Sequence, residues 1–209
     1  SKNNEFNSLF FDPASQNRFI NLWLAIVHRY KDVQVPLIFE LLNEVVLAET
    51  TPWNELAQKA VSALRATAPE CQIMVGSNNY NAASELRHLK LFNDPNICYT
   101  FHFYEPFLFT HQKAYWTKVV KEYNQDLEYP GTFSGLEEFL VKAPQYREDF
   151  DWLINKPLDR DLMYELLQPA LDFKGQTGCD LYCGEYGVIE TVDAKSRQNW
   201  HADLLLSLI

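Results

Sequence analysis

The sequence has few glycines, few basic residues and no long hydrophobic stretch. Only seven of its 209 residues are glycine, and neither of the phosphate-binding loops GxGxxG and GxxxxGK[ST] occurs. The 18 lysines and arginines are outnumbered by 28 aspartates and glutamates, which gives a formal charge of −10. A surface of that sign repels nucleic-acid phosphates and anionic lipid. We therefore expect neither nucleic acid nor a membrane as a partner.

Other absences narrow the chemistry. No apolar run approaches the roughly 20 residues that span a bilayer, and the polar start SKNNEF lacks the basic and apolar regions of a secretion leader. The four cysteines form no CxxC pair, so a zinc site is not expected, and free buried thiols are the predicted state. A GxSxG nucleophile elbow is also absent, which disfavours acyl-transfer chemistry.

Apolar strands alternate with amphipathic helices along the chain. The patterns predict strands over residues 35–42, 72–76, 97–104 and 180–185, and helices over 15–30, 51–67, 82–92, 159–173 and 193–209. The near-continuous apolar run at 35–42 predicts a strand covered on both faces. Roughly 75 residues separate Tyr104 from Asp180, too many for one crossover, so a structured excursion is expected there.

This alternation predicts an α/β fold with a parallel sheet. A closed (β/α)8 barrel takes roughly 250 residues, so four strand-helix units plus an excursion account for this chain. We predict a partial (β/α)8 TIM barrel, an incomplete single domain over residues 1–209, whose possible partner is the missing remainder of the barrel. A complete small doubly wound sheet is the alternative.

Polar side chains follow every predicted strand. The strand ends carry Asn43 and Glu44, then Ser77, Asn78 and Asn79, then His102 and Tyr104, and finally Glu185. Because the carboxyl ends of parallel strands meet at one edge of the sheet, and barrel enzymes place their chemistry there, we expect these groups to face one rim. His102 and Tyr104 are two residues apart and so share a face of their strand.

Two glutamates at different strand ends suggest paired-carboxylate chemistry. Glycosidic bond cleavage needs one protonated and one ionised carboxyl group, on opposite sides of the bond. A separation of about 5 to 5.5 Å predicts retention of configuration, and about 6.5 to 9.5 Å predicts inversion. Taken singly, Glu44 or Glu185 could be an ordinary solvated carboxylate at a strand end.

Three motifs carry a family resemblance. FELLNEV, then YTFHFYEPFLFTHQKAYW, then CGEYGV resemble glycoside hydrolase family 5, the cellulase family, and bacterial endo-β-1,4-glucanases in particular. The resemblance implies that Glu44 is the acid/base and Glu185 the nucleophile. It also implies that His102 and Tyr104 contact substrate and nucleophile, and that His111 and Trp116 contact sugar.

The chain also departs from the family's pattern. Val45 stands where proline is usual, and the family's first three strands and its last strand are missing, with the side chains they supply. The resemblance implies a retaining endo-glycosidase of β-1,4-linked plant polysaccharide, with glucan as the first substrate and mannan as the second, and a sugar-hydroxyl contact at Asn43. It implies no metal or organic cofactor, and export to the cell exterior or the periplasm. The alternative is an inactive sugar-binding or scaffolding fragment.

Overall fold

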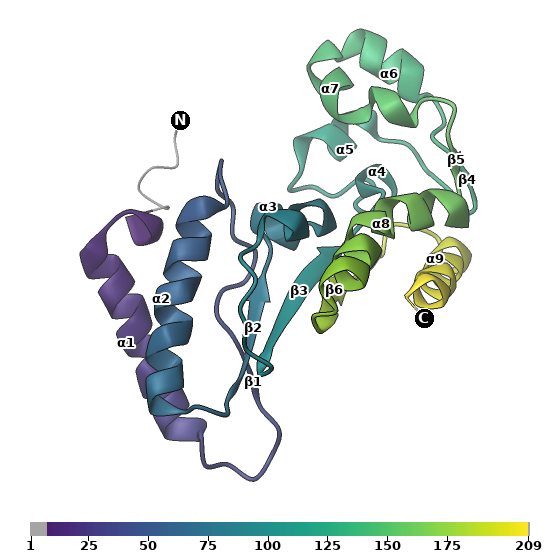
Figure 1. Cartoon of the computed structure of the whole chain (residues 1–209). Coiled ribbons are helices and arrows are strands. Elements are labelled where there is room, and N and C mark those ends of the chain that lie inside the picture. Colours follow the sequence, from purple (N-terminus) through teal and green to yellow (C-terminus); the bar gives the residue numbers. More distant parts are fainter. Residues whose placement is uncertain (1–7, 209) are drawn as a thin grey trace. The chain divides into compact units, whose positions relative to one another are not determined.

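The computed structural model describes residues 8–208, which divide into two compact units (Figure 1). The first unit holds the chain up to His102 together with Pro169–Gly184. The second holds Phe103–Gln168 and the chain from Glu185 onward. Within residues 8–208, no helix is both long enough and apolar enough to cross a membrane.

A four-stranded sheet forms the centre of the fold. Its strands lie in the order β1 (Ile38–Glu40), β2 (Gln72–Gly76), β3 (Ile97–Phe103) and β6 (Leu181–Tyr186). β2 runs parallel to both β1 and β3, with Ile73 opposite Phe39 on one side and Ile97 on the other. Residues Tyr99 and Asp180 link β3 to the start of β6 through an N–H···O bond of 2.8 Å. The predicted α/β class is confirmed.

The two central strands are buried and the outer strands are not. All but the first residue of β2 are buried, and so are all but one of β3. The predicted strand over 35–42 is reduced to three residues, and Ile38 is 55% exposed, so the prediction that both its faces are covered is wrong. β1 has β2 as its one neighbour among the described strands, and the sequence pattern does not encode that edge position.

The four cysteines are free thiols, as predicted, but each is only half-buried. The predicted burial is therefore wrong. Cys183 lies on β6, which alternates between half-buried and exposed residues. An apolar run alone does not distinguish such an outer strand from a central one.

Two long helices, α1 (Pro13–Tyr30) and α2 (Thr51–Thr67), lie side by side in the first unit (Figure 1). α1 begins earlier than predicted because Asp12, not Ser15, is its N-cap: the Asp12 carboxylate accepts from two backbone N–H groups of the first turn. α2 has the predicted bounds. Its fully buried Trp53 donates from Nε1 to the carbonyl of Gly76 at 2.8 Å and so ties α2 to the end of β2.

The helix predicted over residues 82–92 is wrong. Two short elements occupy this part of the chain, α3 (Asn78–Asn81) and the 3-10 helix η2 (Ala83–His88). The backbone at Asn79, Tyr80 and Asn81 has positive φ, between 49° and 62°. Asparagine enters this left-handed region more readily than most residues. These three residues directly precede the predicted range, and they keep α3 from continuing into η2 as one regular helix.

The predicted excursion folds as a series of short elements in the second unit. In chain order these are α4 (Phe107–Thr110), α5 (Lys118–Tyr123), β4 (Gly131–Thr132), α6 (Leu136–Lys142), η3 (Pro144–Tyr146), α7 (Arg147–Phe150), η4 (Asp151–Leu153) and β5 (Pro157–Leu158). α8 (Arg160–Thr177) follows and contains Pro169, where the chain returns to the first unit. The remaining elements are η1 (Ser8–Phe10) and α9 (Ala194–Ser207), which Asp193 caps as predicted.

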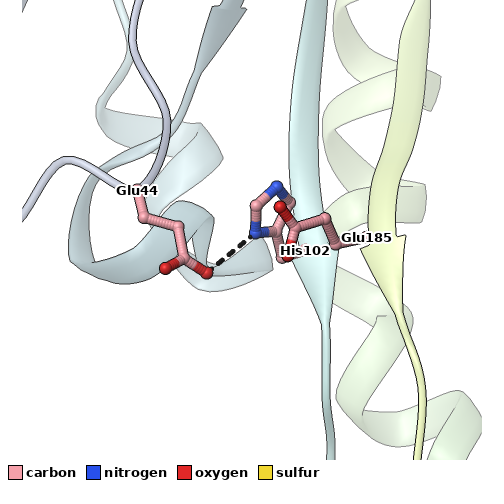
Figure 2. Close-up of side chains that lie close together, drawn as sticks. All are labelled: Glu44, His102 and Glu185. Atoms are coloured by element: carbon pink, nitrogen blue, oxygen red, sulfur yellow. Dashed lines mark hydrogen bonds and ion pairs between the residues drawn. The ribbon is translucent and has the colours of Figure 1, made fainter.

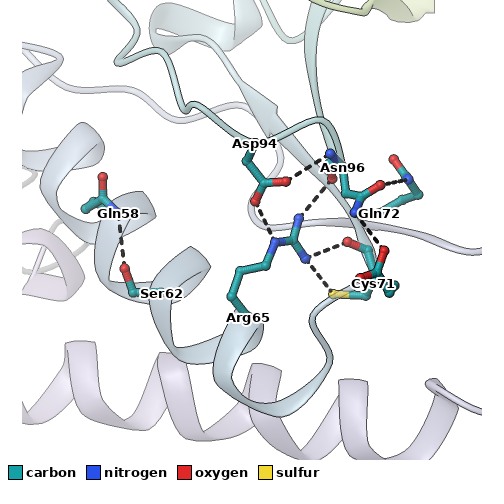
Figure 3. Close-up of polar contacts among 8 residues, drawn as sticks. Gln58, Ser62, Arg65, Cys71, Gln72, Asp94 and Asn96 are labelled. Atoms are coloured by element: carbon teal, nitrogen blue, oxygen red, sulfur yellow. Dashed lines mark hydrogen bonds and ion pairs between the residues drawn. The ribbon is translucent and has the colours of Figure 1, made fainter.

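Arg65, near the end of α2, organises the amino-terminal ends of β2 and β3 (Figure 3). Its guanidinium lies 2.5 Å from Asp94 and donates to the carbonyls of Cys71, at 2.6 Å, and Asn96, at 3.1 Å. Burial alone would raise the pKa of Asp94, but hydrogen bonds from the Arg65 side chain and the Asn96 backbone outweigh it and lower the pKa. The planar guanidinium of Arg65 therefore connects α2 to the two segments that precede β2 and β3.

We expect Arg65→Lys to lower the free energy of unfolding by about 2 kcal/mol, because lysine keeps the charge but cannot serve Asp94 and both carbonyls at once. Urea denaturation followed by circular dichroism measures the loss. Gln58→Ala is the control: its side chain makes an exposed hydrogen bond to Ser62 on the same helix (Figure 3), and we expect a change below about 0.5 kcal/mol. Equal stability of Arg65→Lys and wild type would contradict the role given to the guanidinium.

Candidate active site

Glu44 and His102 meet at the carboxyl-terminal edge of the sheet, within the first unit. Glu44 lies on the loop after β1 with φ 46°, and its Oε1 lies 3.0 Å from Nδ1 of His102 on β3 (Figure 2). His102 is 7% exposed, whereas a third of the Glu44 side chain remains accessible. The buried ring therefore holds one oxygen of a carboxylate whose other oxygen is available to a ligand.

The end of β6 reaches this ring through a glycine. A Cβ built on Gly184 would lie 2.7 Å from Oγ1 of Thr100 and 3.4 Å from Nε2 of His102. The first distance is shorter than real side chains allow, so only glycine permits this close approach to β3. Glu185, which Figure 2 also labels, is the next residue along β6.

In the second unit, Tyr104 holds Glu185. The Tyr104 hydroxyl donates a hydrogen bond of 3.0 Å to Oε2 of Glu185. A hydroxyl donor stabilises the ionised form of a carboxylate. Glu185 is half-buried, so this hydrogen bond is partly shielded from competing water.

An aromatic cluster surrounds His111 in the same unit. The His111 ring stacks on Phe107 at 4.3 Å, meets Tyr104 edge-on at 5.5 Å and meets Trp116 edge-on at 6.5 Å. Burial lowers the pKa of His111, which favours a neutral ring. Trp116 is 58% exposed and its neighbour Tyr115 is 83% exposed. Flat, accessible rings of this kind are suited to stacking against sugar.

The predicted site residues thus fall into two groups. Asn43, Glu44 and His102 belong to the first unit, where Asn43 is exposed on the same loop as Glu44. Tyr104, His111, Trp116 and Glu185 belong to the second. The sequence analysis missed Asn81, whose buried side-chain amide lies 3.2 Å from Nε2 of His102. Three asparagines between residues 78 and 81, directly after a strand, were the available signal.

The open parallel sheet and its covering helices place the chain among the (β/α)8-barrel proteins, as the partial barrel that the sequence predicts. The family model described as "Cellulase (glycosyl hydrolase family 5)" matches residues 4–208. The chain therefore belongs to glycoside hydrolase family 5, and the predicted family is confirmed.

Several known proteins resemble the chain over nearly all of its length. Endoglucanase C of Acetivibrio thermocellus is 42% identical over 199 residues, which cover 95% of this chain and 58% of that protein. Solved structures of Cel5A from Thermotoga maritima in complex with cellobiose and with mannotriose are 26% and 27% identical. Both have a TM-score of 0.72, and both matches cover 97% of this chain and 58% of the other. The chain thus spans somewhat over half the length of these relatives.

Glu105 follows Tyr104, and its surroundings strongly alter its pKa. Burial raises its pKa to about 7 from 4.5, even though its Oε2 accepts a hydrogen bond of 3.0 Å from the backbone N–H of Phe107. Between pH 4.5 and 7 the folded protein therefore binds more protons at Glu105 than the unfolded chain does. Its contribution to stability is fully present below about pH 4.5 and is lost as pH rises through about 7.

We expect Glu105→Gln to be about 2 to 3 kcal/mol more stable than wild type at pH 8 and nearly equal to it at pH 4, because glutamine keeps the acceptor for Phe107 but never ionises. Urea denaturation at both pH values measures the difference. Glu138→Gln, at an exposed position of α6, serves as the control and should shift stability by less than about 0.5 kcal/mol at either pH. A stability difference that does not change with pH would show that Glu105 ionises normally.

Proposed function

We propose that the chain carries the catalytic centre of a retaining, endo-acting hydrolase of β-1,4-linked glucan, within a single catalytic domain. Glu44 is the acid/base and Glu185 the nucleophile. One observation carries the proposal: the His102 ring that binds Glu44 also adjoins Gly184, the residue before Glu185. Glu185 directly follows Gly184 in the chain, which supports assigning the two glutamates to one catalytic centre.

In the first step, the Glu185 carboxylate attacks the anomeric carbon, and a C–O bond forms between enzyme and sugar. The glycosidic C–O bond breaks as Glu44 gives its proton to the departing oxygen. Without that proton the leaving alkoxide is a poor leaving group, and a correctly placed acid is worth about 10² to 10⁴ in rate. The step ends with a glycosyl ester on Glu185 and an ionised Glu44.

In the second step, Glu44 acts as a base. It takes a proton from a water molecule, whose oxygen attacks the anomeric carbon and displaces the Glu185 carboxylate. Two displacements at one carbon restore the original configuration. Both glutamates return to their starting protonation states, and no atom changes its oxidation state.

Tyr104 and the aromatic cluster have supporting roles. The Tyr104 hydroxyl donates to Oε2 of Glu185 and so orients the proposed nucleophile. Trp116 offers an exposed ring for stacking beside His111. Asn43, exposed on the Glu44 loop, supplies hydrogen bonds to sugar hydroxyl groups. His102, whose two ring nitrogens contact Glu44 and Asn81, acts on the sugar by orienting Glu44.

The substrate class is inferred from the relatives. Endoglucanase C supports β-1,4 glucan as the first candidate. The Thermotoga maritima Cel5A structures with cellobiose and with mannotriose support mannan as a second. A polymer of either kind cannot enter a cell, so we also propose that the protein acts outside the cytoplasm.

A second candidate function is sugar binding without turnover. It is favoured by the open sheet, because among the described strands β1 and β6 each have a single neighbour. We propose that the remainder of a full barrel covers these edges in an active enzyme. Assays of the native polypeptide beside the 209-residue chain separate the two: turnover by the native polypeptide supports the enzyme, whereas cellobiose binding without turnover by either supports the binding protein.

We expect Glu44→Ala and Glu185→Ala each to reduce turnover of a soluble β-glucan by at least about 10²-fold. Azide separates their roles. With 2,4-dinitrophenyl β-cellobioside, azide should restore Glu185→Ala by replacing the nucleophile and give the α-glycosyl azide. With Glu44→Ala it should trap the glycosyl-enzyme and give the β-glycosyl azide, because the dinitrophenolate departs without an acid.

The controls are Glu49→Gln and Glu190→Gln, which remove exposed carboxylates near each proposed catalytic residue. Both should keep wild-type turnover. Unchanged activity of Glu44→Ala or Glu185→Ala would refute the role given to that residue. The same product anomer from both alanine variants would refute the division of roles between them.

A further inference from the structure

Asn81 contacts the ring nitrogen of His102 that Glu44 does not touch. It is the last residue of α3, has φ 56° and is fully buried. Its Nδ2 lies 3.2 Å from Nε2 of His102, while Glu44 takes Nδ1 of the same ring at 3.0 Å. A buried asparagine, a histidine and a half-buried glutamate thus form one hydrogen-bonded row.

The Asn81 amide is built for this single contact. A Cβ on Gly76 would lie 2.7 Å from Oδ1 and 2.8 Å from Nδ2 of Asn81, so the amide occupies the space of a missing side chain at the end of β2. Among the described residues, Oδ1 of Asn81 has no hydrogen-bond partner. A buried amide oxygen without a hydrogen-bond partner lowers the stability of the fold. The contact with His102 is the interaction that Asn81 gains in return.

The amide has a preferred orientation. As placed, the NH2 group donates to Nε2 and the oxygen occupies the position without a partner. Turning the amide over would put two N–H donors at that position, and unpaired buried N–H groups are rarer in proteins than under-used carbonyl oxygens. The donor therefore faces His102, and an imidazole nitrogen that accepts cannot carry a proton.

We propose that Asn81 is a positioning residue that holds His102 in the tautomer protonated at Nδ1. In that tautomer Nδ1–H donates to Oε1 of Glu44, so Oε1 is always an acceptor and the transferable proton of Glu44 is confined to Oε2. The consequence for catalysis rests on the acid/base role proposed for Glu44. The tautomer itself does not depend on that role.

The arrangement serves both steps of the proposed reaction. As the acid, Glu44 presents its proton on the oxygen that points away from His102. As the base, it receives the proton of water on the same oxygen. His102 transfers no proton in either step. Asn81 and His102 therefore fix the position of the Glu44 proton without accepting it.

The tautomer can be measured without turnover. We would label histidine with 15N in the native polypeptide and record long-range 1H–15N spectra of the imidazole rings, assigning His102 by the signals lost in His102→Gln. The expected result is one protonated nitrogen, Nδ1, and one unprotonated nitrogen, Nε2. A ring protonated at Nε2, or at both nitrogens, would overturn the proposal.

Asn81→Asp tests the role of the amide. Aspartate tolerates the positive φ of this position but can only accept from Nε2, so the His102 signals should change to the Nε2–H or doubly protonated form. Asn78→Asp is the matched control: it is the same substitution on the same helix, at a buried asparagine bonded to Leu47 rather than to His102. It should leave the His102 signals unchanged. A His102 tautomer that is identical in Asn81→Asp and wild type would refute the proposal.

Kinetics connect the tautomer to the acid. Asn81→Asp should lower kcat/KM for a β-glucan about 10- to 100-fold but change kcat/KM for 2,4-dinitrophenyl β-cellobioside by less than about threefold, because kcat/KM reports the first step and only the poor leaving group needs a placed proton there. Equal losses on both substrates would contradict the proton-placing role. If Glu44→Ala proves fully active, the proposed function fails, whereas the measured tautomer still decides whether Asn81 orients the ring.

Discussion

The hydrogen bond between His102 and Glu44 is the interaction on which the other side chains at the carboxyl-terminal edge of the sheet depend. It joins the end of β3 to the loop after β1, two segments separated in the sheet by the whole width of β2. The parallel register of the three strands sets where β1 and β3 end relative to each other. A shift of one residue in that register would turn His102 to the opposite face of the sheet and leave Glu44 without its partner.

Two of the seven glycines lie where the surroundings of His102 are most crowded. Gly76 leaves room for the Asn81 amide, and Gly184 lets β6 approach Thr100 and the histidine ring. A side chain at either position would displace the groups that fix the ring. The sequence thus places two of its scarce glycines where backbone must approach a side chain closely, and both positions serve the same histidine.

The two ends of the sheet have different tasks. At the amino-terminal end, Arg65 binds the two segments that precede β2 and β3 with one guanidinium, and its partners are backbone carbonyls and a carboxylate with a lowered pKa. At the carboxyl-terminal end, side chains with accessible oxygens follow the strands, and the backbone adopts positive φ at Glu44 and Asn81. In (β/α)8 barrels, the amino-terminal ends of the strands generally stabilise the fold, and the loops at the carboxyl-terminal ends carry the functional residues. The two ends of this sheet follow that pattern.

Local sequence patterns were enough to predict the bounds of β2 and α2, the Asp193 cap, the α/β class and the family. These features rest on apolar periodicity, end signals and short motifs, all of which act between residues close in the chain. The roles of the seven predicted site residues, from Asn43 to Glu185, remain predictions. Only the tertiary structure decided that β1 is a short edge strand, that the segment over residues 82–92 forms only the short 3-10 helix η2, and that Asn81 contacts His102. Each of these depends on a neighbour distant in sequence, and no local pattern records which neighbour folding will bring.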